Sequence, residues 1–256
     1  MKYQASSNSK QSSAASTYWH EPDAGLAQRA PPTKQAKTAR GHTFFGDVVV
    51  YHESELEHRV STTLSAYCDI VEIHSQYPKV EYVDADGILR THTFDFFIVT
   101  RDGKRIAIAV KQARKKAAME ELMARIVANG ITAIEKDGTL VPSIADAVFV
   151  ATNLEASFAC FENATAIIAS RPHHDDAECA VLAKIVQRMP GRFRFGQLLL
   201  NVPTPFKRRT AIWRLIDLRL IEPIVDGRID ELSWLCVSRP ALPHDSINQL
   251  KGLQHG

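Results

Sequence analysis

The chain contains 256 residues, 45% of them hydrophobic and 23% charged, which is the composition of an ordinary globular protein. This composition excludes collagen-like chains and chains that are disordered throughout. The length favours two modest domains over one large domain. The 31 basic and 29 acidic residues leave a formal net charge of +2, so any affinity for nucleic acid must come from local patches and not from bulk charge.

The four cysteines are far apart and form no CxxC pair, so the sequence predicts neither a zinc ribbon nor a dense disulfide framework. We expect reduced and mostly buried thiols at Cys68, Cys160, Cys179 and Cys236. No apolar run of signal-peptide type follows Met1, and no segment approaches transmembrane length. We therefore expect a cytoplasmic protein with no membrane partner.

Residues 1–40 are rich in Ser and Ala and end in the basic residues Lys34, Lys37 and Arg40. Such a segment cannot bury enough apolar surface to offset the entropy lost on ordering. The sequence therefore predicts a disordered, mildly basic arm over these residues.

A mixed α/β domain is predicted over residues 41–170. Its first helix, at 54–68, begins with an S-x-x-E capping box formed by Ser54 and Glu57. The later elements follow from hydrophobic periodicity. They are strands at 79–83, 91–100 and 105–110, a helix between Lys111 and Gly130, a strand at 147–152 and a helix through 168. This order predicts a mixed sheet flanked by helices.

A second domain is predicted over residues 171–240, after a polar linker at 170–176. Its elements are a helix at 177–188, a segment at 195–200, a helix that begins at Thr204 with Pro205 in its first turn, and two strands around 226–227. Three helices followed by a hairpin form the outline of an all-α, winged helix-turn-helix domain. Residues 241–256 are expected to form a flexible tail.

The hairpin before Lys111 decides which side chains share a face of the sheet. A three-residue loop at 101–103 would place Asp95 opposite Ala109 and on the same face as Lys111. A two-residue loop would move Lys111 to the other face, because a slip of one residue reverses every side chain. The three-residue loop is favoured because it aligns one apolar face. The residues of this face are Phe94, Phe96, Ile98, Ile106, Ile108 and Val110.

Glu57, Asp95 and Lys111 together are the residue types that metal-dependent phosphodiester hydrolysis needs. Carboxylates hold a divalent metal that activates water, and a lysine orients that water or stabilises the developing oxyanion. Taken alone, Glu57 is better explained as a capping-box residue. Only the combination of the three residues favours catalysis.

Four segments carry a more specific resemblance, namely residues 54–57, 73–78, 93–99 and 107–111. They resemble the PD-(D/E)xK nuclease core of TnsA-like proteins, the endonuclease subunits of heteromeric cut-and-paste transposons. The resemblance implies a restriction-endonuclease-like core with Glu57, Asp95 and Lys111 as catalytic residues. It also implies that Gln76 is a supporting motif residue.

The resemblance implies a bacterial, Mg²⁺-dependent DNA endonuclease that accepts Mn²⁺ and cleaves the 5′ strands at the transposon ends of double-stranded DNA. Its implied partners are a DDE-type transposase subunit, which cuts the 3′ strands, and an AAA+ ATPase regulator. Glu57, Asp95 and the backbone carbonyl of Val110 would hold the metal. Ala109 stands where such nucleases usually carry Glu, Asp or Gln, so one oxygen ligand is missing and activity stays open.

Contacts with DNA or a partner are expected from two basic groups. The first is Arg114, Lys115 and Lys116, beside the proposed site, and the second is Lys207, Arg208, Arg209 and Arg214, on the predicted recognition helix. A solvated helix face explains the first group equally well, and contact with the ATPase regulator is the alternative for the second.

Two other functions remain open at the level of sequence. A stand-alone nuclease of the restriction or phage type would cut DNA without partners. A catalytically degenerate adaptor would only bind DNA or the ATPase, and Ala109 is the residue that supports this alternative. A winged-helix transcription regulator is disfavoured because it gives Glu57, Asp95 and Lys111 no common purpose.

Overall fold

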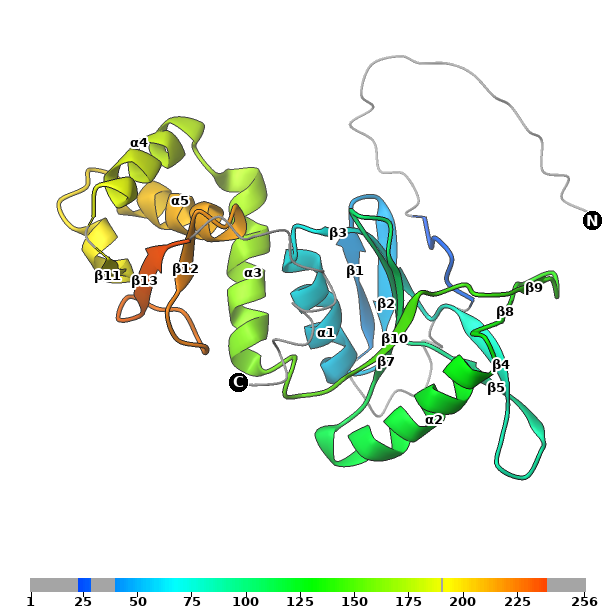
Figure 1. The fold of residues 1–256 in the computed structure, drawn as a ribbon. Helices are drawn as coiled ribbons and strands as arrows, with labels where there is room; N and C mark the ends of the chain where they lie inside the picture. The colour runs from blue at the N-terminus through cyan, green and yellow to red at the C-terminus, as the bar shows by residue number, and fades with distance from the viewer. Residues whose placement is uncertain (1–22, 29–39, 190, 239–256) are drawn as a thin grey trace, which may run out of the picture.

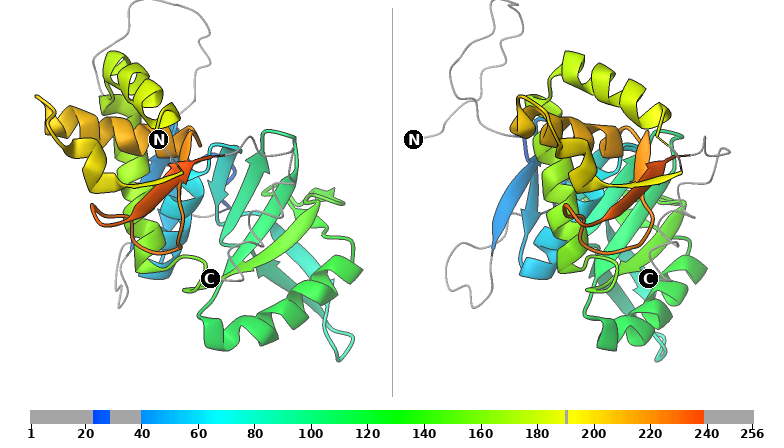
Figure 2. Two further views of the ribbon diagram at one scale, coloured as in Figure 1. Left: turned by 60° about the vertical axis from the view of Figure 1, so that its left-hand side comes forward. Right: turned by 90° about the vertical axis from the view of Figure 1, so that its left-hand side faces the viewer.

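The computed structural model describes residues 23–28, 40–189 and 191–238 (Figure 1). This part of the chain is mixed α/β, as predicted. It has a sheet unit, which we define as the elements from β1 to β10, and a helical unit, defined as the elements from α3 to β13. Helix α3 lies between the central sheet and the other helices of the helical unit (Figures 1 and 2).

Four strands form the central sheet in the order β10-β7-β6-β3. Strands β3, β6 and β7 are antiparallel, whereas β10 is parallel to β7. A parallel neighbour requires a crossover, and helix α2 provides it. The bounds are β3 Ile70–Ser75, β6 Phe96–Thr100, β7 Arg105–Val110, α2 Lys116–Ala128 and β10 Ala147–Ala151. A short 3-10 helix, Ala113–Lys115, precedes α2.

Helices cover both faces of this sheet, which explains why β6 and β7 are almost continuously apolar and do not alternate with polar residues. Helix α1 (Glu55–Ala66) packs on one face through Leu56, Val60 and Leu64. Helix α2 packs on the other face through Met123 and Ile126. A hairpin that the sequence analysis did not predict, β1 (Gly41–Phe45) with β2 (Val48–His52), extends the α1 side.

The turn between β6 and β7 is the predicted three-residue loop. Thr100 donates its backbone N–H to the carbonyl of Lys104 over 2.9 Å, and Gly103 has a positive φ of 83°. Phe96 consequently pairs with Ile108. The register prediction is confirmed over β6.

The expected strand at 91–100 is in fact two strands. β5 (Leu89–Thr93) pairs with β4 (Lys79–Val83), and β6 begins only at Phe96. The break at residues 94–95 places Phe94 in the α2-side core with Ala109, not with Phe96 as predicted. The predicted face of Phe94 was wrong because the prediction assumed one unbroken strand, in which side chains alternate regularly. Strands β8 (Ala133–Ile134) and β9 (Leu140–Val141) complete a second sheet, in the order β5-β4-β8-β9.

Residues 23–28 lie within the expected disordered arm but are held on the sheet unit. Val49 donates its N–H to the carbonyl of Asp23 over 2.7 Å, and Gln28 donates to the carbonyl of Gln76 over 3.2 Å. Backbone pairing holds this segment although its composition offers little apolar surface. Other parts of the arm and the expected tail lie outside the described residues.

The helical unit contains a third core and a small antiparallel sheet in the order β11-β13-β12. Its elements are α3 Phe158–His173, α4 Asp176–Gln187, β11 Arg192–Arg194, the 3-10 helix η2 Phe195–Leu199, α5 Pro205–Asp217, β12 Ile221–Pro223 and β13 Trp234–Val237. The polar segment expected as a linker is mostly helical, because α3 continues to His173. Most of the segment at 195–200 forms the 3-10 helix η2.

Among the described residues, no helix is both long enough and apolar enough to span a membrane. The four cysteines are free, as expected, but each is only partly buried. The expectation of mostly buried thiols was wrong, because Cys68 lies in the turn after α1 and the other three lie at partly exposed positions of α3, α4 and β13.

Arg171 of α3 joins the two units. Its guanidinium donates to both carboxylate oxygens of the buried Asp217, at 3.1 and 2.9 Å. It also donates to the carbonyls of Ser65 and Ala66 at the end of α1, at 2.8 and 2.9 Å. The Arg171 side chain therefore donates to carbonyls of α1 that have no partner within the helix, and it also neutralises the carboxylate at the end of α5.

We expect Arg171→Met to lower the free energy of unfolding by about 3 kcal/mol, because it leaves the buried carboxylate of Asp217 with Arg214 alone. Urea denaturation measures this loss, and adding Asp217→Asn should recover part of it. Arg125→Met is the matched control, since Arg125 forms an exposed pair with Glu121, and it should cost less than about 0.5 kcal/mol. Equal losses in the two single variants would contradict the role given to Arg171.

Candidate active site

Glu57 lies in the first turn of α1, where half of the predicted capping box is formed, because its carboxylate accepts the N–H of Glu53 and not that of the N-cap Ser54. Ser54 is the N-cap, and its Oγ accepts the N–H of Glu57 over 3.2 Å. The carboxylate of Glu57 accepts from Ser54 Oγ at 2.9 Å and from the N–H of Glu53 at 2.7 Å. These bonds fix the carboxylate while each oxygen keeps a lone pair. The capping role and a role in a site are therefore compatible.

Asp95 occupies the break between β5 and β6, next to the end of β7. Its backbone N–H donates to the carbonyl of Ile108 over 3.0 Å, and its Oδ2 accepts the N–H of Val110 over 2.7 Å. Burial raises the pKa of Asp95 to about 6. The ammonium of Lys111 and the Val110 N–H oppose this rise, and the carboxylates of Glu57 and Glu53 add to it.

Lys111 follows β7 directly, and its backbone N–H donates to the carbonyl of Ala151 over 3.0 Å. Its charge acts on Asp95 and on His92, whose pKa is lowered to about 4 chiefly by burial and then by Lys111. The three predicted catalytic residues are thus electrostatic neighbours. Sequence reasoning missed Glu53 and His92, because no motif marks a residue before an N-cap or a histidine within a hairpin strand.

Gln76 contacts Asp95 through the backbone, by donating its N–H to the Asp95 carbonyl over 2.8 Å. Gln76 is buried and has a φ of 53°, a left-handed conformation that costs free energy for a residue with a side chain. Its carbonyl accepts from Gln28 of the segment at 23–28. The position of Asp95 is therefore supported from β3 and from that segment.

Ala109 is fully buried in the α2-side core, together with Phe94 and Val150. A carboxylate at position 109 would have to replace apolar contacts at this point. Position 109 therefore supplies core packing in place of an oxygen ligand for a metal.

The oxygen atoms at this site are of the kind that Mg²⁺ prefers. Glu57 and Asp95 offer carboxylates, and the backbone carbonyl of Val110 is adjacent to the N–H that holds Asp95. Within the described ranges, no three His, Cys, Asp or Glu side chains gather as a complete metal site. Mg²⁺ is commonly held by one or two carboxylates together with substrate phosphates, so this donor set fits the ion.

The two predicted basic groups differ in their surroundings. In the first group, Arg114 and Lys115 are exposed, whereas Lys116 is paired with the buried Glu155 at 2.7 Å.

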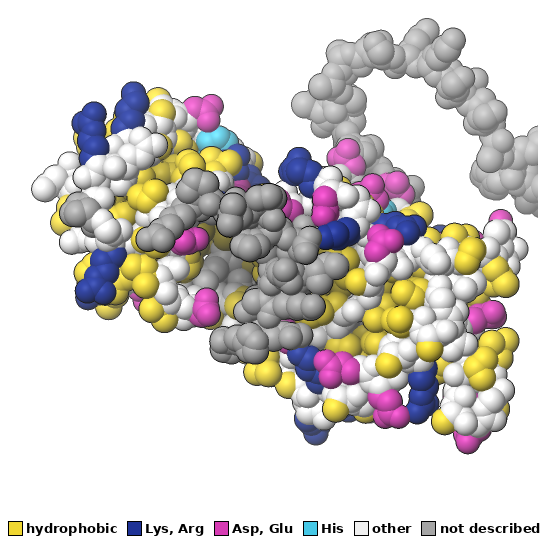
Figure 3. Space-filling view, viewed as in Figure 1, with side chains coloured by type: hydrophobic (Ala, Val, Ile, Leu, Met, Phe, Trp, Pro, Cys, Tyr) yellow, Lys and Arg dark blue, Asp and Glu magenta, His cyan; other side chains and the backbone are white. Residues whose placement is uncertain are grey.

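In the second group, on α5, every cation has a carboxylate partner. The pairs are Lys207 with Asp175, Arg208 with Glu178, Arg209 with Glu231 and Arg214 with Asp217. Arg208 is also buried, so it offers no surface to DNA. Lys and Arg side chains are scattered among Asp and Glu side chains on the face shown in Figure 3.

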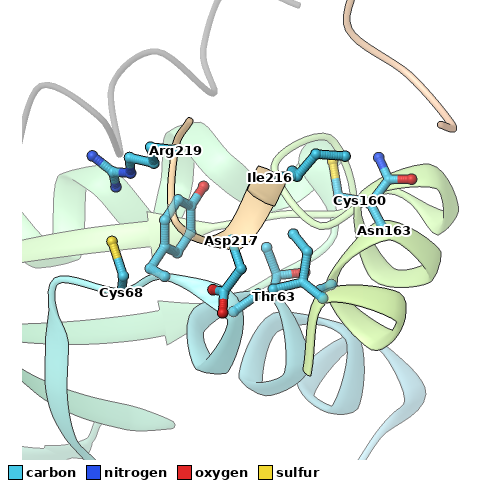
Figure 4. A pocket seen from close by; sticks show the side chains of 11 residues that line it. Thr63, Cys68, Cys160, Asn163, Ile216, Asp217 and Arg219 are labelled. Carbon is cyan, nitrogen blue, oxygen red and sulfur yellow. The ribbon is translucent and has the colours of Figure 1, made fainter. Parts of the chain in front are cut away.

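Two hollows flank α1. The first has a volume of about 460 Å³ and lies between the start of α1 and the end of β7, beside Lys111. The second, of about 240 Å³, lies at the junction of α1, α3 and α5, where Thr63, Cys160 and Asp217 line it (Figure 4). Burial raises the pKa of Tyr67 in this second hollow to about 12. The first hollow is lined by Lys111, a predicted site residue. No predicted site residue is among the described residues that line the second hollow, and its carboxylate, Asp217, is already paired with arginines.

The raised pKa of Asp95 predicts a specific dependence of stability on pH. An unfolded Asp loses its proton near pH 4, whereas folded Asp95 keeps its proton to about pH 6, so the free energy of unfolding falls as pH rises between these values. We expect Asp95→Asn to gain stability relative to the wild type by on the order of 1–2 kcal/mol between pH 4 and 7.5. Urea denaturation in EDTA at both pH values measures the gain. A difference that does not change with pH would contradict this environment for Asp95.

No protein-family model matches the sequence, and no curated protein matches it either. The TnsA-like resemblance therefore remains a prediction from short motifs. Support for a function comes from the fold and from the neighbourhood of Glu57, Asp95 and Lys111.

Proposed function

We propose that the chain is a metal-dependent DNA endonuclease with a restriction-endonuclease-like core, acting as the nuclease subunit of a heteromeric cut-and-paste transposase. One observation carries the nuclease proposal. Glu57, Asp95 and Lys111 come from a helix start, a strand break and a strand end, yet they form one electrostatically coupled group. The transposase assignment rests in addition on the TnsA-like motifs.

The order of elements supports the same proposal. A helix, three antiparallel strands, a second helix and a parallel fourth strand place the coupled group at one end of the central sheet. Loops and strand ends are where a rigid sheet can present reactive groups to a large substrate.

Each residue of the group has a definite part in phosphodiester hydrolysis. Glu57 and Asp95, with the Val110 carbonyl, would hold Mg²⁺ or Mn²⁺, which supplies an activated water and neutralises phosphate charge. The Val110 N–H fixes one oxygen of Asp95, so the carboxylate is oriented before substrate binds. Lys111 stabilises the negative charge that develops on the phosphate oxygens, or orients the attacking water.

The helical unit is proposed to be winged-helix-like and to dock partner proteins. Helices α4 and α5 and the strands β12 and β13 have the order that such a domain requires. The cations of α5 are neutralised by carboxylates of the same unit, which favours a protein partner over the DNA backbone. The AAA+ ATPase regulator and the DDE-type transposase are the partners that the resemblance implies.

A catalytically degenerate adaptor is the second candidate, and the burial of Ala109 in the core is the observation that favours it. In this case the coupled group would retain its charges without cutting DNA. A stand-alone nuclease differs from the main proposal only in its independence of partners.

Cleavage of DNA labelled at the transposon ends, with Mg²⁺ or Mn²⁺ and the candidate partners, tests the proposal. We expect Asp95→Asn and Lys111→Met each to reduce cuts on the 5′ strands by at least about 100-fold and to leave 3′ cuts in place, since even the loss of outer-shell partners of a metal costs 10–100-fold. Asp146→Asn is the matched control, because Asp146 pairs with Arg105 at the opposite end of β7. Identical products from wild type and Asp95→Asn would favour the adaptor. Cutting by the chain alone would favour a stand-alone nuclease.

A further inference from the structure

The larger hollow beside α1 has a cationic lining. Its residues are Ser54, Glu55, Leu56, Arg59, Val110, Lys111, Gln112 and Lys115. Three of these side chains are cations and one is a carboxylate, so the lining carries an excess of two positive charges. A hollow of this kind attracts a small anion, because nearby protein excludes the water that would screen the charges.

Arg59 is the unusual member of this lining. Its side chain is only 9% exposed, and its Nε is buried without a hydrogen-bond partner among the described residues. The nearest carboxylate oxygen, Oε1 of Glu55, is 4.0 Å away, which is too far for a hydrogen bond. A buried guanidinium normally has its N–H groups satisfied, so Arg59 keeps unused donor capacity in a side chain that lines the hollow.

The position of the guanidinium is set by α3. The centre of the Phe158 ring lies 4.3 Å from the guanidinium carbon of Arg59, a cation–π contact that holds the guanidinium beside α3. Arginine recognises a phosphate with two parallel N–H donors, and a planar fork held in advance loses little entropy on binding. The contact therefore restrains Arg59 at the hollow, and the oxyanion that suits a restrained guanidinium has at least two oxygens.

Lys111 belongs both to this hollow and to the coupled group with Asp95. An anion bound by Arg59 would thus lie beside the phosphate that is cut. Successive phosphates along a strand are the anions that a DNA substrate places side by side in this way.

We propose that Arg59 binds a DNA backbone phosphate next to the scissile phosphate and fixes the register of the strand in the site. This inference rests on the proposed nuclease function and adds a positioning residue that the sequence motifs do not mark. Lys115 contributes at the exposed rim, and the carboxylate of Glu55 competes with the phosphate for Arg59.

The test uses the full chain, a fluorescein-labelled 30-base-pair duplex and EDTA, with binding followed by anisotropy between 50 and 200 mM salt. One lost phosphate contact reduces the slope of log affinity against log salt by about 0.9. We expect Arg59→Gln to show this reduction and to bind about tenfold more weakly at low salt. Glu55→Gln should change affinity in the opposite direction, because it removes the competing carboxylate.

Arg105→Gln is the matched control, since Arg105 lies at the far end of β7, about 16 Å along the strand from Val110. It should leave the salt slope unchanged. Thermal unfolding shows whether Arg59→Gln is folded, and if it is not, Glu55→Gln and Lys115→Gln carry the test through their opposite effects on affinity.

The outcomes separate the two proposals. Binding that neither Arg59→Gln nor Glu55→Gln alters, together with cleavage that depends on Asp95, would overturn the phosphate site and leave the nuclease intact. Reduced binding by Arg59→Gln, without cleavage by the wild type, would support the site in a DNA-binding adaptor. A wild-type chain that does not bind the duplex would overturn the phosphate site, and the cleavage assay with the candidate partners then decides the nuclease function separately.

Discussion

The hydrogen bond from the N–H of Val110 to Oδ2 of Asp95 organises the end of the sheet unit that carries the candidate site. At this point β6 has not yet begun, so a side-chain oxygen takes the place of the backbone acceptor that a continuing strand would supply. The same bond allows the chain to turn away into β5 and fixes the carboxylate beside Lys111. The same contact thus serves both the strand geometry and the placement of Asp95, which its backbone bonds to Ile108 and Gln76 also support.

Local signals in the sequence predicted the parts of this arrangement that depend on neighbours in the chain. The N-cap at Ser54 and the loop at 101–103 involve residues within a few positions of each other, and both formed as expected, except that the carboxylate of Glu57 accepts the N–H of Glu53 in place of that of Ser54. The break at Asp95 was missed because it depends on Val110, fifteen residues away. Ala109 is buried because helix α2 covers its face of the sheet, and that cover does not show in the pattern of residues within one strand.

Charge was the least predictable property. The basic residues of α5 are consecutive or nearly so in the sequence and resemble a DNA-reading surface. Their partners, such as Glu178 and Glu231, come from other elements and neutralise them in the fold. Arg59 showed the reverse, since nothing in its sequence context distinguishes it, yet burial leaves its guanidinium without a close acceptor. Only tertiary structure decides which cations remain available.

The guanidinium of Arg171 gives helix α1 a mechanical role. It joins the last carbonyls of α1 to Asp217 at the end of α5, while the first turn of α1 carries Glu57. A helix of twelve residues is a rod about 18 Å long that hardly stretches. A displacement of α5 would therefore act on the last turn of α1 through Arg171. Because the helix is stiff, its first turn would move as well, and with it the carboxylate of Glu57. A shift of α5 would in this way reach Glu57 along the length of α1 without altering a strand.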